Sequence, residues 1–261
     1  MSKSLEPLNW YGTYILTVRE TTRFLRVYNQ TIISPAVSAL IFLLIFVMAL
    51  GNSSSYAIGG IKFANFIGYG LIIMSIIQNA FANSSSSLIM SKIIGYVSDI
   101  LMPPLGGMEL TIAFCIGSLL RGLMVGITVT IFLAPFIEFV VYHPFILLFF
   151  TVGSCLLMGM LGILAGIISN SFDQYGAITS YVITPLSFLS GTFYSVERLP
   201  GFLQIINFFN PFFYIIDGFR YSLTNYADGN ISIGIIILSV MNLGLFFIVV
   251  ELLNKGWGVK E

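Results

Sequence analysis

The sequence predicts an all-α, polytopic membrane protein with six transmembrane helices, and two observations carry this prediction. The chain is 57% hydrophobic and only 8% charged, whereas soluble domains carry about 25% charged residues. Its apolar residues gather in stretches close to the roughly 20 residues that a helix needs to cross a bilayer. We expect membrane segments at residues 32–50, 63–83, 110–134, 144–168, 177–194 and 231–250, within one transmembrane domain that spans 1–261.

Residues 10–29, which precede the first membrane segment, have the pattern of an amphipathic helix. Aromatic and aliphatic residues, Trp10 among them, fall on one side of this helix. Arg19, Arg23 and Arg26 gather roughly on the opposite side. Basic amphipathic helices with Trp and Tyr settle at the membrane–water interface, so we expect an interfacial helix here. The alternative is a short soluble helix that binds a partner protein.

The stretch after the second membrane segment is expected to lie outside the membrane. Four polar residues, 84–87, are predicted to break the helix that precedes them. A short amphipathic helix is then predicted at 88–102, where apolar residues repeat at helical spacing and Lys92 and Asp99 interrupt them. Two prolines end this helix, because proline lacks the N–H that a helix interior requires. The segment is too charged to be a span.

The third membrane segment contains a charge well inside a predicted span, Arg121. An intramembrane charge is energetically costly and is by default a functional residue. The alternative is that the long stem of the side chain lets the guanidinium reach the inner interface. No Asp or Glu falls in the middle of a predicted span, so the sequence shows no evident proton or sodium relay.

Glycines four residues apart occur in the third segment, at Gly122 and Gly126, and in the fourth, at Gly162 and Gly166. Such pairs let two helix backbones approach closely. The pattern is compatible with packing inside the chain and with a contact between two copies of the chain.

The fifth membrane segment carries several residues that a simple spanning helix would not need. Thr184, Pro185 and Ser187 fall at membrane depth. Backbone that is interrupted at this depth requires protein or a water-filled cavity to satisfy its polar groups. We therefore expect these three residues to face the interior of the protein or a pathway through it.

Residues 195–223 are predicted to form a re-entrant hairpin on the outer side of the membrane. The apolar run within them is short, and Asn210–Pro211 interrupts it, since a proline disfavours helical geometry in the residue before it. The alternative is that residues 199–216 form a full span. The residues expected to form this outer gate are Ser190, Gly191, Tyr194, Pro200, Asn210, Pro211, Asp217 and Arg220.

The distribution of positive charges predicts that both termini lie in the cytoplasm, because lysine and arginine favour the cytoplasmic side. Six spans in that orientation place seven of these residues inside: Lys3, Arg19, Arg23, Arg26, Lys92, Lys255 and Lys260. Three lie outside: Lys62, Arg198 and Arg220.

Catalytic and metal-binding patterns are weak in this sequence. Cys115 and Cys155 each lie inside an apolar run, and His143 is the single histidine. One histidine makes neither a metal site nor a catalytic triad, and the sequence has no Gly-Lys phosphate-binding loop. We therefore expect no catalytic residue, no metal and no cofactor. The net charge of zero gives no reason to expect nucleic-acid binding.

Three stretches of the sequence form a recognisable set. The first is KIIGYVSDILMPP at 92–104, which leads to Glu109, and the second is Arg121-Gly122-Leu123. The third runs from Phe172 to Tyr221 and contains FDQYGAITSYVITPLSFLSGTFYSVERLP and NPFFYIIDGFRY. Together they resemble the membrane subunit of an ABC-2-type ATP-binding-cassette transporter. The resemblance covers nearly the whole chain and is greatest to bacterial inner-membrane permeases of unknown substrate.

This resemblance implies partners and a division of labour. Two copies of the chain form the pathway, as a homodimer, and each binds a separate ATP-binding-cassette ATPase on the cytoplasmic side. The helix at 10–29 is then the elbow at the membrane surface, and 88–102 is the coupling helix that receives motion from the ATPase. The residues to which the resemblance gives this coupling role are Lys92, Ile93, Gly95, Tyr96, Val97, Asp99, Pro103 and Pro104.

The resemblance also implies export of a hydrophobic or amphipathic molecule, such as a drug, a lipid or a lipid-linked glycan, across the inner (cytoplasmic) membrane. The chain itself is then not an enzyme. The alternative is a secondary transporter that works without ATP, which would usually show internal repeats and ionisable residues at the membrane midplane. A membrane-embedded enzyme is a third class, and it would need a nucleophile, base or metal set that the sequence does not display.

Overall fold

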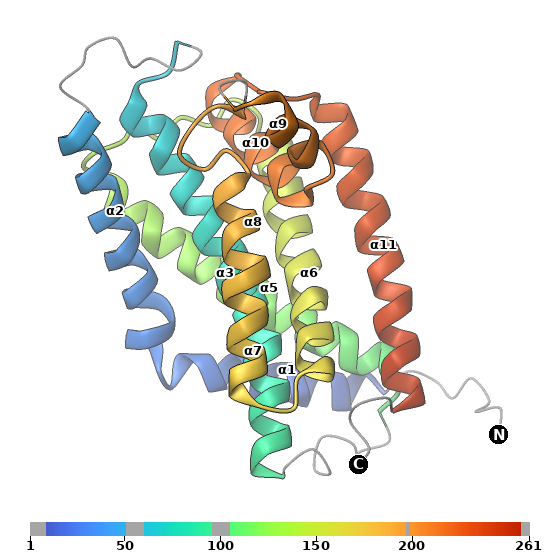
Figure 1. Cartoon of the computed structure of the whole chain (residues 1–261). Coiled ribbons are helices and arrows are strands. Elements are labelled where there is room, and N and C mark those ends of the chain that lie inside the picture. Colours follow the sequence, from blue (N-terminus) through green and yellow to red (C-terminus); the bar gives the residue numbers. More distant parts are fainter. Residues whose placement is uncertain (1–8, 51–59, 96–104, 197–198, 257–261) are drawn as a thin grey trace.

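The computed structural model describes residues 9–50, 60–95, 105–196 and 199–256, which form helices and their connections and contain no strand. The long helices run side by side, α1 lies across the lower end of the bundle, and α9 and α10 gather at the upper end (Figure 1). This arrangement confirms the predicted all-α, polytopic fold. In chain order the elements are α1 (Trp10–Leu25), η1 (Asn29–Ile33), α2 (Ser34–Leu50), α3 (Phe63–Ile94), α5 (Gly107–Leu133), α6 (Pro144–Ile168), α7 (Phe172–Ile178), η2 (Thr179–Ile183), α8 (Thr184–Leu189), α9 (Gly201–Phe208), α10 (Pro211–Thr224) and α11 (Ile231–Lys255).

Among the described residues, five helical stretches are long and apolar enough to cross a membrane: Asn29–Ala49, Phe63–Ile94, Gly107–Leu133, Pro144–Ile168 and Ile231–Lys255. The fifth predicted segment is also helical, as three consecutive pieces: α7, the π-helical η2 and α8. These pieces run from Phe172 to Leu189, so the helix begins and ends earlier in the chain than the predicted 177–194. They follow the height of the bundle, in front of α3 and beside α6 (Figure 1).

The first helix, α1, is amphipathic, but its buried side carries a charge. Asn9 caps its N-terminus by accepting a hydrogen bond from the Gly12 N–H at 2.9 Å. Leu16, Glu20 and Phe24 are buried against the bundle, whereas the aromatic residues at its start are exposed. An exposed aromatic surface beside a membrane span is what an interfacial helix requires.

The central helix of the bundle is α3, and it does not break where the sequence predicted a break. It continues through Ser84–Ser87 to Ile94. The prediction failed because the serines satisfy their hydroxyls without leaving the helix. Ser84 donates to the Gly159 carbonyl of α6 at 2.6 Å, and Ser85 donates to the Phe81 carbonyl one turn earlier at 2.7 Å. Gly95, with a φ of 83°, ends the helix.

The predicted coupling helix therefore divides between two parts of the chain. Lys92 and Ile93 belong to the last turn of α3, and Gly95 is its cap. The remaining coupling residues, Tyr96, Val97, Asp99, Pro103 and Pro104, lie outside the described residues.

The glycine pairs serve packing inside the chain. A Cβ at Gly162 of α6 would clash with Ser84 and with the Phe81 carbonyl of α3. A Cβ at Gly126 of α5 would lie 2.7 Å from Ile76 of the same helix α3. The glycines therefore let α5 and α6 approach α3 closely, which resolves the alternatives in favour of an intrachain contact.

The two ends of the bundle differ in their elements. At the lower end, the Asn9 N–H donates to Glu109 at the start of α5, and the Gly107 N–H donates to Asn254 near the end of α11, at 3.1 and 2.7 Å. Both ends of the described chain therefore lie at this end, which we call the α1 end (Figure 1). Residues 190–196 and 199–224, which include α9 and α10, lie at the opposite end, and we call them the cap.

Candidate functional site

The cap begins where α8 ends. Gly191 adopts a φ of 79°, a left-handed conformation that glycine reaches without strain, and the chain turns sharply there. The end of a helix leaves backbone carbonyls without partners. Thr192 donates its hydroxyl to the Ser187 carbonyl at 2.7 Å, and Tyr194 donates to the Leu189 carbonyl at 3.1 Å. Side chains of the turn therefore satisfy the backbone that the turn exposes.

Asn210 joins the corner between α9 and α10 to the end of α8. Its amide nitrogen donates to the Ser190 hydroxyl at 2.7 Å and to the Leu186 carbonyl at 3.1 Å. Its amide oxygen accepts the Phe212 N–H at 3.1 Å, which caps α10. Pro211 occupies the first position of that helix, where the missing N–H costs nothing.

Arg220 of α10 is the largest fully buried side chain of the described chain, with 1% of its surface exposed. One guanidinium nitrogen donates to the Gly191 carbonyl at 2.7 Å. The guanidinium carbon lies 3.6 Å from the centre of the Phe66 ring of α3, a stacked cation–π contact. One side chain thus fixes the turn of the cap to the central helix.

Asp217, one turn before Arg220, organises the connection to α11. Its two carboxylate oxygens accept the N–H groups of Asp228 and Gly229 at 2.8 and 2.9 Å. Burial raises the pKa of the Asp217 carboxyl to about 6, against the lowering effect of these two donors and of the Arg220 charge. Asp228 in turn accepts the Ser195 hydroxyl at 2.7 Å.

The structure brings seven of the eight predicted outer-gate residues into this one network or its helix ends: Ser190, Gly191, Tyr194, Asn210, Pro211, Asp217 and Arg220. Pro200 is exposed and precedes α9. Asp228 was not among the predicted site residues, although the Asp228–Gly229 pair has the composition of a turn.

The three residues predicted at membrane depth in the fifth segment do not share one environment. Ser187 is buried and donates its hydroxyl to the Ile183 carbonyl at 2.7 Å. Thr184 is half-buried, and Pro185 is exposed near the start of α8. Only Ser187 therefore points into the bundle.

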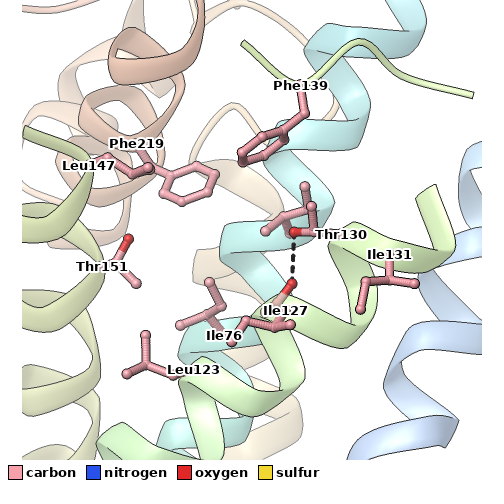
Figure 2. A pocket seen from close by; sticks show the side chains of 11 residues that line it. Ile76, Leu123, Ile127, Thr130, Ile131, Phe139, Leu147, Thr151 and Phe219 are labelled. Atoms are coloured by element: carbon pink, nitrogen blue, oxygen red, sulfur yellow. Dashed lines mark hydrogen bonds between the residues drawn. The ribbon is translucent and has the colours of Figure 1, made fainter. Parts of the chain in front are cut away.

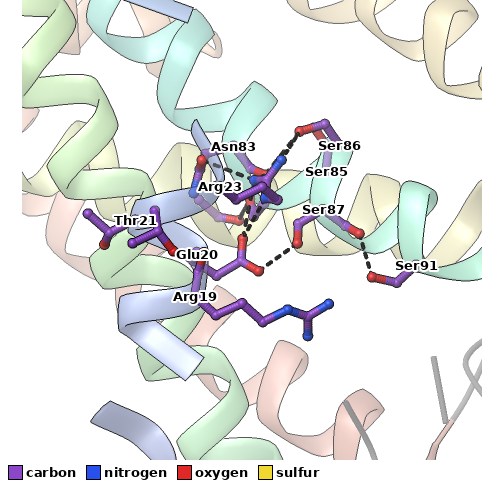
Figure 3. Close-up of polar contacts among 12 residues, drawn as sticks. Arg19, Glu20, Thr21, Arg23, Asn83, Ser85, Ser86, Ser87 and Ser91 are labelled. Atoms are coloured by element: carbon purple, nitrogen blue, oxygen red, sulfur yellow. Dashed lines mark hydrogen bonds and ion pairs between the residues drawn. The ribbon is translucent and has the colours of Figure 1, made fainter. Parts of the chain in front are cut away.

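A second polar cluster lies near the α1 end, between α1 and α3 (Figure 3). The Glu20 side chain is fully buried and pairs with Arg23 at 3.2 Å. Ser87 donates its hydroxyl to Glu20 at 2.7 Å. Arg23 donates to the backbone carbonyl of Asn83 at 2.6 Å and to the Ser86 hydroxyl at 3.2 Å. We call these five residues the elbow cluster, and the serine run that was expected to break α3 supplies part of it.

Arg121 of α5 lies one helical turn beyond Gly117, and the backbone of Gly117 packs closely against the Glu20 side chain, which a Cβ at this position would approach to 2.9 Å. It is 8% exposed and donates to the Asn79 amide oxygen of α3 at 3.0 Å. Within the described part of the chain, no carboxylate forms an ion pair with it. The guanidinium thus lies inside the bundle rather than at its surface, where a snorkelling side chain would place it.

Lys92 ties the end of α3 to the end of α6. Its ammonium donates to the backbone carbonyls of Ile167 and Ser169 at 2.5 and 3.1 Å. A cation at the C-terminus of a helix is favourable, because unpaired carbonyls carry partial negative charge there. Since α7 begins three residues after Ser169, Lys92 connects the predicted coupling region to the start of the fifth segment.

The described residues contain no group of three His, Cys, Asp or Glu side chains that could hold a metal ion. Cys115 and Cys155 are buried and unbonded to each other. The polar side chains of the cap and of the elbow cluster form hydrogen bonds mainly to backbone groups and to one another. Both clusters are therefore suited to holding helices in register.

Comparison with known proteins gives a consistent result. Residues 11–224 match the family model described as ABC-2 type transporter. The chain is 31% identical over 257 residues to proteins named inner membrane transport permease YadH from Escherichia coli K12 and from Shigella flexneri, covering 97% of this chain and 99% of theirs. The match includes α1, the elbow cluster, Arg121 and the whole cap. The protein therefore belongs to the ABC-2 type transporter family, as a membrane-embedded transport subunit.

Proposed function

We propose that this chain is the permease of an ATP-driven exporter in the inner membrane, and that a separate ATP-binding-cassette ATPase drives it from the cytoplasm. The family match and the full-length similarity to transport permeases carry this proposal. The substrate class that we propose is hydrophobic or amphipathic, which suits the uncharged, aromatic-rich membrane segments and their scattered Ser and Thr residues. A secondary transporter is the competing function.

The orientation in this proposal places the α1 end in the cytoplasm and the cap outside. Arg19, Arg23, Lys92 and Lys255 belong to elements at the α1 end, whereas Lys62, which caps the start of α3, and Arg220 of α10 lie at the cap end. This asymmetry agrees with the preference of positive residues for the cytoplasmic side.

We further propose that the cap is a re-entrant gate over the outer end of the pathway. Its two helices are short, and α9 carries a row of exposed apolar side chains, including Phe202, Ile205 and Phe208. Such a surface suits contact with lipid or with a second copy. A short, interrupted element can move without unfolding a whole span, while Asn210 and Arg220 keep it attached to α8 and α3.

A homodimer is part of the proposal, because the fifth segment packs on few neighbours within one chain. Tyr181 and Val182 near its middle are exposed, and α7 has no buried residue. A second copy would cover this surface together with the exposed side of α2.

Energy coupling is tested by replacing Ile93, which is exposed on the last turn of α3. If this turn presses on the ATPase, Ile93→Asp places an unpaired charge in the contact. We expect ATP hydrolysis by the reconstituted complex to fall by about tenfold or more, with normal amounts of the permease in the membrane, because losing a central contact residue costs more than about 1.4 kcal/mol of association. Ile93→Leu is the matched control and should retain activity. Undiminished hydrolysis in the Asp variant would contradict this placement.

Arg121 is proposed to hold α5 against α3 along the transport pathway. Arg121→Lys keeps the charge but loses the planar, multi-donor geometry of the guanidinium. We expect lower ATP-driven transport at normal membrane levels. Arg26→Lys, at an exposed position of the elbow, is the control and should be silent. A fully active Arg121→Lys variant would show that Arg121 contributes only its positive charge and that the geometry of the guanidinium is not needed.

A further inference from the structure

A cavity of about 280 Å³ lies between α5 and α6 near the cap end of the bundle (Figure 2). Ile76 of α3 forms part of its floor, and Leu123 and Thr151 form parts of its α5 and α6 walls. Phe139, from the connection between α5 and α6, and Phe219 of α10 lie at its upper end (Figure 2). The cavity is separate from the elbow cluster and from the hydrogen-bonded network of the cap.

The walls of the cavity are almost entirely apolar. Two threonines supply its side-chain hydroxyls, and Thr130 already donates its own to the Gly126 carbonyl at 2.8 Å. A buried water needs two to four polar partners, and cavities lined by aliphatic and aromatic side chains stay dry. The chemistry of the walls therefore favours an apolar occupant over water or an ion.

The mouth of the cavity opens on the outer surface of the membrane helices. Ile127 and Ile131 line the cavity and are nevertheless 61% and 64% exposed, so they form its rim. Leu148 on the neighbouring turn of α6 is also exposed. In a membrane protein this surface faces the hydrocarbon layer, and the molecules that reach such a mouth are lipid acyl chains.

We propose that this cavity is a binding site for one acyl chain of a bilayer phospholipid. The chain enters between α5 and α6 over the rim isoleucines and packs against Ile76 and Phe219. Because Phe219 lies one residue before Arg220 on α10, the bound chain supports the cap from the bilayer side. The lipid is thus a structural ligand of the permease and is distinct from the molecule that the permease transports.

A photoreactive phospholipid tests this assignment. The purified protein is reconstituted with a phosphatidylethanolamine that carries a diazirine in its acyl chain, illuminated without ATPase or cargo, and digested for adduct mapping. We expect adducts to concentrate on Leu123, Ile127 and Thr151, above the level on Phe247, an exposed residue of α11 that serves as internal reference. Thr151→Phe places a ring in the cavity and should remove most of the cavity adducts while the α11 adducts remain.

Ile236→Phe is the matched control, because Ile236 is exposed on α11, away from the cavity, and the added ring should leave the cavity adducts unchanged. Thr130→Leu is a second filling variant, to be used if Thr151→Phe does not elute as a folded protein. Labelling that is no stronger in the cavity than on α11, or that persists in the filled variants, would overturn the assignment. A disulfide between two copies of an Ile131→Cys variant would also overturn it, because a second chain would then cover the mouth.

Discussion

Replacing Arg220 by alanine is expected to destabilise the protein by about 3 kcal/mol, because a buried guanidinium contributes a charged hydrogen bond, a cation–π contact and packing volume. The Gly191 carbonyl would lose its donor at 2.7 Å, and the Phe66 ring would lose the cation that lies 3.6 Å from its centre. Because Gly191 turns the chain from α8 into the cap, the loss should appear first as loosening of the cap.

Thermal unfolding in detergent, together with limited proteolysis of the cap, measures this effect. Arg220→Lys should recover only part of the stability, since an ammonium cannot stack as a plane on Phe66 while it donates to Gly191. Phe209→Ala is the matched control, because Phe209 also lies in the cap but is 85% exposed. An Arg220→Ala protein as stable as the Phe209→Ala protein would show that the guanidinium does not hold the cap.

Replacing Glu20 by alanine should also have a large effect, of about 2–3 kcal/mol, because it leaves the partners of a buried carboxylate unpaired. Ser87 would lose its acceptor at 2.7 Å, and Arg23 would lose its counter-charge at 3.2 Å. Arg23 is 31% exposed, so it can partly rehydrate, and for this reason we place the cost below that of a fully buried pair.

The chain contains a suitable control in Glu251, which pairs with Lys255 at 2.6 Å while both side chains are 67% exposed. Glu251→Ala should leave the melting temperature almost unchanged, because an exposed ion pair contributes little to stability. Melting curves of Glu20→Ala, of Arg23→Ala and of the double variant would give the coupling energy of the buried pair. Equal melting temperatures for the Glu20 and Glu251 variants would contradict a structural role for the elbow cluster.

The fold class could be predicted from sequence because apolar runs of membrane length are a direct consequence of the thickness of the bilayer. The serine run of α3 could not be read correctly, since its polarity is compensated by partners distant in sequence. Ser84 bonds to Gly159 and Ser87 to Glu20, and neither contact leaves a periodic signal. The predicted helix break was therefore wrong for a tertiary reason.

The cap and the elbow cluster differ in how well they could be predicted from the sequence. The cap could be predicted, because Gly191, Asn210 and Pro211 each have local conformational preferences that mark turns and helix starts. The elbow cluster could not be predicted. Glu20 lies in a helix that also carries exposed arginines, so its sequence position suggests that it belongs to the exposed polar face. Only the packing of α1 on α5 and α3 shows that this carboxylate is buried.

The central claim is that a separate ATPase powers this permease, and purification of the tagged chain from its own membrane in mild detergent tests it most directly. Mass spectrometry of the complex should find an ATP-binding-cassette ATPase in equal amount to the permease, and Ile93→Asp should weaken the association or uncouple its ATP hydrolysis. A chain that purifies without any ATPase, and that in proteoliposomes transports its substrate on an ion gradient alone, would contradict the account.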